Sequence, residues 1–143
     1  MTKTLGAKAT VLYVEDEEND VFFMQMAFRK EGLDHALRTV GNGREAIDYL
    51  AGNAAYADRE RHPLPSVVLL DLNLPLISGF DVLRWLREQP ELRNLPVVIF
   101  SSSSRNEDKA KARELGAQAY VEKPKSALVF REVVGLLRKW LAD

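Results

Sequence analysis

Short apolar runs alternate with longer amphipathic segments along the whole of the 143-residue chain. Three runs, at residues 9–14, 67–70 and 96–100, are apolar at nearly every position. Such runs are too short for helices and are typical of strands covered on both faces. Two further runs, at residues 35–40 and 117–122, also predict strands, and the more polar run at 35–40 is expected at an edge of the sheet.

The segments between these runs carry the signals of helices. Ser78 and Asp81 have the spacing of a capping box, in which each side chain bonds the other residue's backbone, and Ser104 and Glu107 repeat that spacing. Gly116 stands where a helix commonly ends in the left-handed conformation. These signals, together with helix-forming composition, predict five helices, at about residues 21–30, 44–50, 79–89, 104–116 and 126–141.

Strand and helix alternate five times, which predicts an α/β protein with a parallel sheet, right-handed crossovers and helices on both faces. The length suits a single domain over residues 1–143, with no internal repeat and no linker to an output domain. Residues 51–65 hold two prolines and a charged patch, so they are interpreted as an extended connection, longer than most.

Polar side chains stand at the carboxyl ends of four of the predicted strands. Glu15 and Asp16 follow the first strand, Asp71 the third, Ser101 the fourth and Lys123 the fifth. In a parallel sheet these ends share one edge, and open α/β sheets bind their ligands in the crevice there. A turn aspartate after a core strand would explain Asp71 alone, but it does not explain the convergence of all five.

Composition and charge narrow the classes of protein that fit. The net charge of −1 and the lack of a basic stripe give no attraction to nucleic acid. The absence of cysteine excludes disulfides, thiolate metal sites and cysteine nucleophiles. No signal peptide and no membrane-spanning run is present, so we expect a soluble, cytoplasmic protein.

The predicted edge has the groups needed for phosphoryl chemistry. Three carboxylates brought together repel one another, so one must take up a proton or all must share a cation. Oxygen ligands without clustered His or Cys favour Mg²⁺. Lys123 adds a point charge for a phosphoryl oxygen and Ser101 a hydroxyl donor, so a carboxylate among them could attack phosphorus and form an acyl phosphate.

This pattern resembles the receiver domains of bacterial two-component response regulators. The motifs that carry the resemblance lie at residues 11–17, 69–75, 99–102 and 120–124, and they cover essentially the whole chain in the family's order and spacing. The resemblance implies a doubly wound, flavodoxin-like sheet of five strands in the order 2-1-3-4-5, for which a chemotaxis member of this family is the standard illustration.

The resemblance also implies a role for each residue at the strand ends. Asp71 would accept a phosphoryl group from a histidine kinase. Asp16 and Asp71 would bind Mg²⁺ together with the backbone carbonyl of Asn73, while Glu15 would act through a water molecule. Lys123 would pair with the phosphoryl group. Glu15 stands where many members carry aspartate, which shifts the geometry of that role.

A second group of residues is implied to transmit the signal. Ser101 would be the switch hydroxyl, in place of the commoner threonine, and Tyr120 the aromatic residue that changes rotamer with it. The bond between Lys123 and Pro124 is expected to be cis. Without an output domain, the signal would leave through the surface of the fourth helix, fifth strand and fifth helix.

The acidic run at residues 15–20 and the long connection at 51–65 look more like the single-domain regulators of phytochrome-type kinases than like chemotaxis regulators. This likeness implies a sensor histidine kinase of bacteriophytochrome type as partner, in a light-sensing pathway. The protein would then be no enzyme beyond its own phosphotransfer and dephosphorylation.

Two other functions share parts of this pattern. A phosphatase of haloacid-dehalogenase type also uses a strand-end aspartate, but it needs a second Asp two residues later as general acid, where this chain has Asn73. A flavin- or nucleotide-binding module of the same fold class would carry a Gly-rich loop after the first strand, where this chain has acidic residues.

The last predicted helix has an unusually wide apolar arc, of about 160° against about 100° for a surface helix that faces one core. Packing on the sheet uses only part of such an arc. We therefore expect a homodimer through this helix, although covering by a neighbouring helix and the chain terminus is the alternative. The residues of the arc are Val129, Phe130, Val133, Val134, Leu136, Leu137, Trp140 and Leu141.

Overall fold

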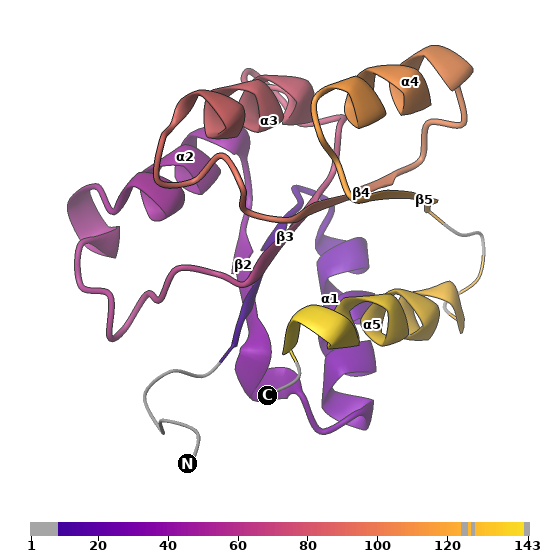
Figure 1. Ribbon diagram of the computed structural model, residues 1–143. Coiled ribbons are helices and arrows are strands. Elements are labelled where there is room, and N and C mark those ends of the chain that lie inside the picture. Colours follow the sequence, from indigo (N-terminus) through magenta and orange to yellow (C-terminus); the bar gives the residue numbers. More distant parts are fainter. Residues whose placement is uncertain (1–8, 124–125, 127, 142–143) are drawn as a thin grey trace.

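The computed structural model describes residues 9–123, 126 and 128–141. Five parallel strands form one sheet in the order β2-β1-β3-β4-β5, as predicted. The crossovers place helices on both faces of this sheet (Figure 1). The strands are β1 (Val11–Val14), β2 (Leu37–Val40), β3 (Val67–Leu70), β4 (Val97–Ser101) and β5 (Ala119–Glu122).

The helices divide the core into two layers. In Figure 1, α2 (Gly43–Ala51), α3 (Gly79–Glu88) and α4 (Asn106–Glu114) lie above the sheet, while α1 (Glu18–Lys30) and α5 (Leu128–Leu141) lie below it. Successive side chains along β1 and β3 pack alternately into one core layer and the other, because successive strand residues face opposite sides of the sheet. This is the doubly wound fold class that the alternating pattern predicted.

The long connection before β3, which the sequence predicted as extended, has local structure of its own. It contains a short 3₁₀ helix, Ala54–Tyr56, and its Arg59 guanidinium donates to the carbonyls of Tyr49 and Leu50 at 2.8 and 2.9 Å. The Leu50 carbonyl lies in the last turn of α2, where helical carbonyls have no partner within the helix, while the Tyr49 carbonyl also accepts from the backbone of Gly52. The connection therefore packs against the carboxyl end of α2.

One of the two predicted capping boxes is confirmed and the other is wrong. Ser78 Oγ accepts from the Asp81 backbone at 3.1 Å, and Asp81 Oδ2 accepts from the Ser78 backbone at 3.2 Å. Ser104 does not cap α4, which begins at Asn106. The N-cap residue of α4 is Arg105, and no side chain caps the helix. The Ser103 hydroxyl bonds residues at the start of α4: it accepts from the Arg105 backbone at 3.3 Å and donates to the Asp108 carboxylate at 2.6 Å.

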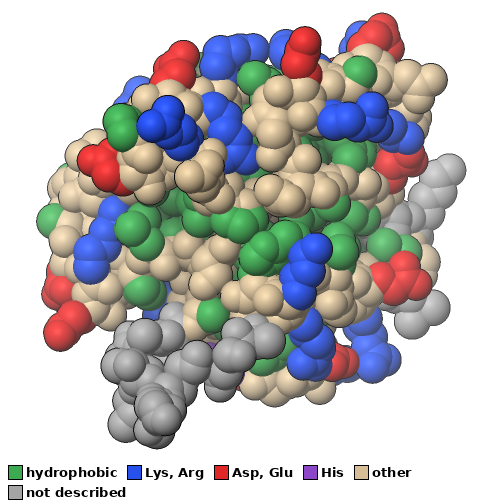
Figure 2. Space-filling model, in the orientation of Figure 1, with side chains coloured by type: hydrophobic (Ala, Val, Ile, Leu, Met, Phe, Trp, Pro, Cys, Tyr) green, Lys and Arg blue, Asp and Glu red, His purple; other side chains and the backbone are tan. Residues whose placement is uncertain are grey.

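The surface carries charges of both signs. In Figure 2, acidic and basic side chains are interspersed on the face shown, and apolar side chains gather in a band between the two helical layers. Among the helices that the structure describes, none has the length and apolar character needed to cross a bilayer.

Candidate functional site

The register of the sheet places the end of β1 beside the end of β3. Val14 pairs with Leu70, so Glu15 and Asp71 leave their strands at the same level. The backbone N–H of Asp71 donates to the Val14 carbonyl at 3.2 Å, which continues the ladder by one step. Both carboxylates are almost inaccessible to solvent, with 2% of each residue exposed. The two carboxylates are therefore positioned by strands that are themselves wholly buried.

A glycine allows the chain to return close to Asp71. A Cβ atom on Gly79 would lie 2.2 Å from the Asp71 carbonyl oxygen and 2.7 Å from the Leu72 Cα, both of which are rigid backbone. No side chain larger than hydrogen fits at that distance, so Gly79 lets the start of α3 pack directly against the site. The N–H of Gly79 also donates to the Leu72 carbonyl at 3.0 Å.

Three carboxylates converge as predicted. One oxygen from each of Glu15, Asp16 and Asp71 lies within 4.8 Å of the others, and Asp16 is the exposed member of the three. Asn73 lies beside them, with its backbone N–H donating to Asp71 Oδ1 at 3.1 Å. The set consists only of hard oxygen donors, so it fits Mg²⁺ or a similar divalent cation.

The Lys123 side chain places its ammonium group among these carboxylates. Its ammonium nitrogen lies 2.8 Å from Glu15 Oε1, 3.0 Å from Asp71 Oδ2 and 2.9 Å from Asp20 Oδ2. The backbone N–H of Lys123 donates to the Ser101 carbonyl at 2.7 Å, which positions the lysine just beyond β5. Burial alone lowers the pKa of this lysine, but bonds to Glu15 and Asp20 and the charge of Asp71 outweigh burial and raise it above the ordinary value.

Glu15 is held by two further groups. The Tyr13 hydroxyl donates to Glu15 Oε1 at 3.1 Å, and the Glu17 backbone donates to Oε2 at 3.2 Å. Burial raises the pKa of the Glu15 carboxyl to about 7, the bond from Lys123 opposes this rise, and the charge of Asp71 adds to it. Burial and the Glu15 carboxylate also raise the pKa of the Tyr13 phenol, which therefore remains a protonated donor.

Sequence reasoning missed two residues of the site, Tyr13 and Asp20. Tyr13 lies two positions before Glu15, on the same face of the strand, so the period of two could have predicted their contact. Asp20 was considered only as part of the acidic run at residues 15–20 and was given no role in the site. No sequence signal connects it with Lys123, which is more than a hundred positions away.

Ser101 and Tyr120, the two residues expected to transmit the signal, both form hydrogen bonds with Ser103. The fully buried Ser101 Oγ accepts from the Asn73 side-chain amide at 3.4 Å and from the Ser103 backbone at 3.2 Å. The half-buried Tyr120 donates its hydroxyl to the Ser103 carbonyl at 2.8 Å. The expected cis bond involves Pro124, which lies outside the described residues.

Comparison with known families agrees with this geometry. Residues 11–134 match the response regulator receiver domain family. The chain therefore belongs to the response regulator receiver domain family, and this favours the receiver over the phosphatase and the flavin- or nucleotide-binding module that were considered as alternatives.

The most similar proteins include regulators named for phytochromes. Response regulator Rcp1 of Synechocystis is 32% identical over 92% of this chain and 88% of its own length, and a structure of its Mn²⁺-bound form superposes with a TM-score of 0.82. The phosphorylated cyanobacterial phytochrome response regulator RcpA is 31% identical over 95% and 96% of the two chains, with a TM-score of 0.85. Response regulator RPA3017, from red light signaling of R. palustris, is 34% identical over 93% and 94%, with a TM-score of 0.84.

Proposed function

We propose that Asp71 is the phosphoacceptor of this receiver domain. The observation that carries the proposal is a nearly inaccessible carboxylate at a strand end, 3.0 Å from the Lys123 ammonium and among two further carboxylates. A lysine so placed can follow the negative charge from the carboxylate to an incoming phosphoryl group. The protein's contribution to such a reaction is positioning and neutralisation of charge, because the transition state is loose.

The proposed step transfers one phosphoryl group. A carboxylate oxygen of Asp71 forms the new bond to phosphorus, and the bond from phosphorus to a histidine nitrogen of the kinase breaks, with its electron pair going to that nitrogen. In dephosphorylation, a water oxygen forms a bond to phosphorus, the bond from phosphorus to the Asp71 oxygen breaks, and inorganic phosphate leaves the restored carboxylate. The protein would catalyse these two reactions on itself and no other.

Asp16, Asp71 and the Asn73 carbonyl, with Glu15 through water, would hold Mg²⁺. Bound there, the ion would neutralise the negative charge on the phosphoryl oxygens. The convergence of the three carboxylates within 4.8 Å supports this assignment, because such a cluster is costly without a cation.

The donor we propose is a sensor histidine kinase of bacteriophytochrome type, in a light-sensing pathway of the cytoplasm. Two of the similar structures are named for phytochrome or red-light signalling, and the likeness extends over more than nine-tenths of this chain. The acidic run and the long connection before β3 were the features of the sequence that pointed the same way.

The test is phosphorylation by acetyl phosphate with Mg²⁺, followed by intact mass and peptide mapping. Wild type should gain the mass of one phosphoryl group on Asp71, and Asp71→Asn should gain none while it stays folded, because the two side chains are nearly isosteric. Asp34→Asn, an exposed aspartate away from the site, is the matched control and should be labelled like wild type. Full labelling of Asp71→Asn, or of wild type in EDTA, contradicts the assignment.

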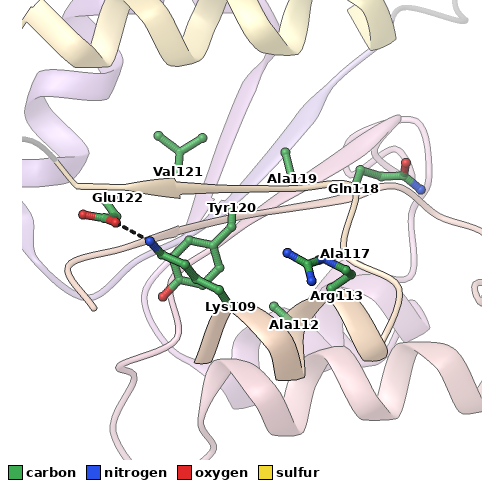
Figure 3. A pocket seen from close by; sticks show the side chains of 9 residues that line it. All are labelled: Lys109, Ala112, Arg113, Ala117, Gln118, Ala119, Tyr120, Val121 and Glu122. Carbon is green, nitrogen blue, oxygen red and sulfur yellow. Dashed lines mark ion pairs between the residues drawn. The ribbon is translucent and has the colours of Figure 1, made fainter. Parts of the chain in front are cut away.

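The proposed output surface is formed by α4, β5 and α5. A groove of about 620 Å³ lies between α4 and β5, lined by Lys109, Arg113, Tyr120 and Glu122 among others. Figure 3 shows Lys109 beside the Tyr120 ring, with its ammonium paired to Glu122 at 2.7 Å. Tyr120 therefore belongs both to this groove and, through Ser103, to the surroundings of Ser101.

Movement of Ser101 toward a phosphoryl group would release the Ser103 backbone and so alter the anchor of Tyr120, which gives the two-state element that a switch needs. Ser101→Ala should still accept phosphate but transmit it poorly. The measurement is the affinity of wild type and of Ser101→Ala for the kinase or another partner, each with and without phosphorylation. Wild-type phosphate dependence in Ser101→Ala would exclude this relay.

Self-association through α5 is the last part of the proposal. Phe130, Val133, Val134 and Leu137 are buried against the sheet and α1, which accounts for the inner part of the apolar arc. Val129, Leu136, Trp140 and Leu141 keep partial exposure at its margin. Sedimentation across a concentration series, with and without phosphorylation, tests this: Leu136→Glu should weaken a dimer, and a strict monomer under all conditions would contradict it.

A further inference from the structure

Lys123 has one partner that the proposed phosphoryl chemistry does not use. Glu15 and Asp71 belong to the acceptor and cation site, but Asp20 lies on α1 and pairs with the same ammonium at 2.9 Å. Asp20 is also the most accessible of the three, with 25% of its side chain exposed against 0% for Glu15 and 3% for Asp71. The ammonium therefore lies between two buried carboxylates and one at the mouth of the site.

The two buried carboxylates accept hydrogen bonds in addition to their contacts with Lys123, whereas the Asp20 carboxylate pairs with the Lys123 ammonium. Glu15 accepts from Tyr13 and from the Glu17 backbone, and Asp71 accepts from the Asn73 backbone. Within residues 9–123, 126 and 128–141, the polar contact of the Asp20 carboxylate is the one to Lys123. Asp20 comes from the amino-terminal part of α1, a helix fixed to the core by three buried side chains, those of Met24, Ala27 and Phe28.

A divalent cation at the carboxylates changes the balance between these partners. Such a cation takes up the charge of Asp71 and Glu15 and repels the ammonium, so both buried partners attract the lysine less. Asp20 is outside the set of three carboxylates that fits the cation, so its attraction for Lys123 remains. A lysine without that partner would either compete with the cation or move out into solvent.

We propose that Asp20 is a positioning residue for Lys123: it retains the ammonium at the mouth of the site while a divalent cation occupies the carboxylates, so that the lysine meets the incoming phosphoryl group. This inference rests on the proposed phosphoacceptor function and adds a residue to it. The ordinary explanation of Asp20, a favourable charge near a helix N-terminus, applies equally to Glu18, which has no such contact with Lys123 among the described residues.

The experiment compares Asp20→Asn with Glu18→Gln, which removes one negative charge from the same end of α1 without touching the lysine. Binding of Mg²⁺ is measured by calorimetry in the absence of phosphodonor, and labelling by acetyl phosphate is measured at saturating Mg²⁺. Asp20→Asn should weaken Mg²⁺ binding roughly tenfold, or about 1.4 kcal/mol, and slow labelling several-fold. Glu18→Gln should change each by less than about twofold at physiological ionic strength, where exposed charges are screened.

A double-mutant cycle with Lys123→Met separates positioning from charge alone. If Asp20 acts through the lysine, Asp20→Asn should have little further effect on Mg²⁺ binding in the Lys123→Met background, and Asp20→Glu should restore most of it in the wild-type background. Equal effects of Asp20→Asn with and without Lys123, or equal effects of Asp20→Asn and Glu18→Gln, overturn the inference.

Failure of the inference and failure of the proposed function give different results. If only the inference is wrong, wild type binds Mg²⁺ and is labelled at Asp71, but Asp20→Asn behaves like Glu18→Gln. If the phosphoacceptor function is wrong, wild type is not labelled at Asp71 under any condition. The proposed role of Asp20 in positioning Lys123 for a phosphoryl group is then wrong as well.

Discussion

The bodies of β1 and β3 and the residues just beyond their carboxyl ends are equally buried but chemically opposite. All eight residues of Val11–Val14 and Val67–Leu70 have 0% exposure, and all are apolar or aromatic. Glu15 and Asp71 follow directly and are only 2% exposed, yet they are carboxylic acids. The same strands thus pass within a single residue from apolar side chains, whose burial stabilises the fold, to carboxylates, whose burial is costly.

This difference explains how the carboxylates of the site are held close together. Burial of a carboxylate without full compensation costs several kcal/mol, whereas each buried aliphatic side chain contributes about 1.5–3 kcal/mol. Rigid apolar strand bodies therefore hold the carboxylates together against their repulsion. In the described part of the chain, Lys123 and a few hydrogen bonds are what satisfies these buried carboxylates.

Truncation within a strand body should have the largest effect on stability. Leu69→Ala truncates a wholly buried side chain of β3, the strand between β1 and β4, and it should lower the free energy of unfolding by about 3–5 kcal/mol. Urea denaturation measures the loss. At low temperature, where the variant is still folded, labelling by acetyl phosphate should persist. Loss of labelling in folded protein would mean that the geometry of the site depends on this side chain in the strand body.

Removal of Lys123 should have the next largest effect, and that effect should depend on metal. In EDTA, Lys123→Met leaves two buried carboxylates without a cation and should cost about 3 kcal/mol of unfolding free energy. Saturating Mg²⁺ should recover part of this loss, because the ion supplies the missing positive charge. Lys109→Met, which breaks a surface pair with Glu122, is the control and should change stability by less than about 1 kcal/mol. An identical loss with and without Mg²⁺ would contradict this account of the site.

The pH dependence of the metal-free protein should reveal the strain at Glu15. Burial raises the pKa of its carboxyl from the ordinary value of 4.5 to about 7 in the folded state, so between these values the native state binds more protons than the unfolded state. Stability from this group is therefore complete below about pH 4.5 and decreases as pH rises through 7, by at most about 1.4 kcal/mol per pH unit. Urea denaturation in EDTA from pH 5 to 8 should show this decline in wild type and a flatter profile in Glu15→Gln. Equal slopes in both proteins would assign the decline to another group.

The smallest effect should come from Tyr13, the residue at which strand body and site meet. Tyr13→Phe retains the buried ring and removes only the hydroxyl that donates to Glu15, so it should cost about 1 kcal/mol. The lost hydrogen bond is the one to Glu15, so Tyr13→Phe should lower the free energy of unfolding by less in the Glu15→Gln background. The same urea denaturation measures this. Tyr49→Phe, whose hydroxyl donates to the Pro63 carbonyl, is the control and should be additive with Glu15→Gln.

The alternation of apolar runs and helices was sufficient to predict the parallel sheet, and the strand ends were sufficient to predict most of the site. Period and composition are local properties, and the carboxyl ends of parallel strands always share an edge. Glu15, Asp16, Asp71 and Lys123 therefore converge as the sequence indicated. The family resemblance added the strand order and the roles of individual residues.

Details that depend on the approach of separate elements were decided only by the tertiary structure. The choice of Ser103 over Ser104 at the start of α4 depends on where the chain leaves β4, and both serines have suitable chemistry. The pairing of Lys123 with Asp20 depends on how α1 packs below the sheet beside the end of β5. Contacts between residues so distant in sequence leave no periodic signal, because the packing of the whole core sets the distance between them.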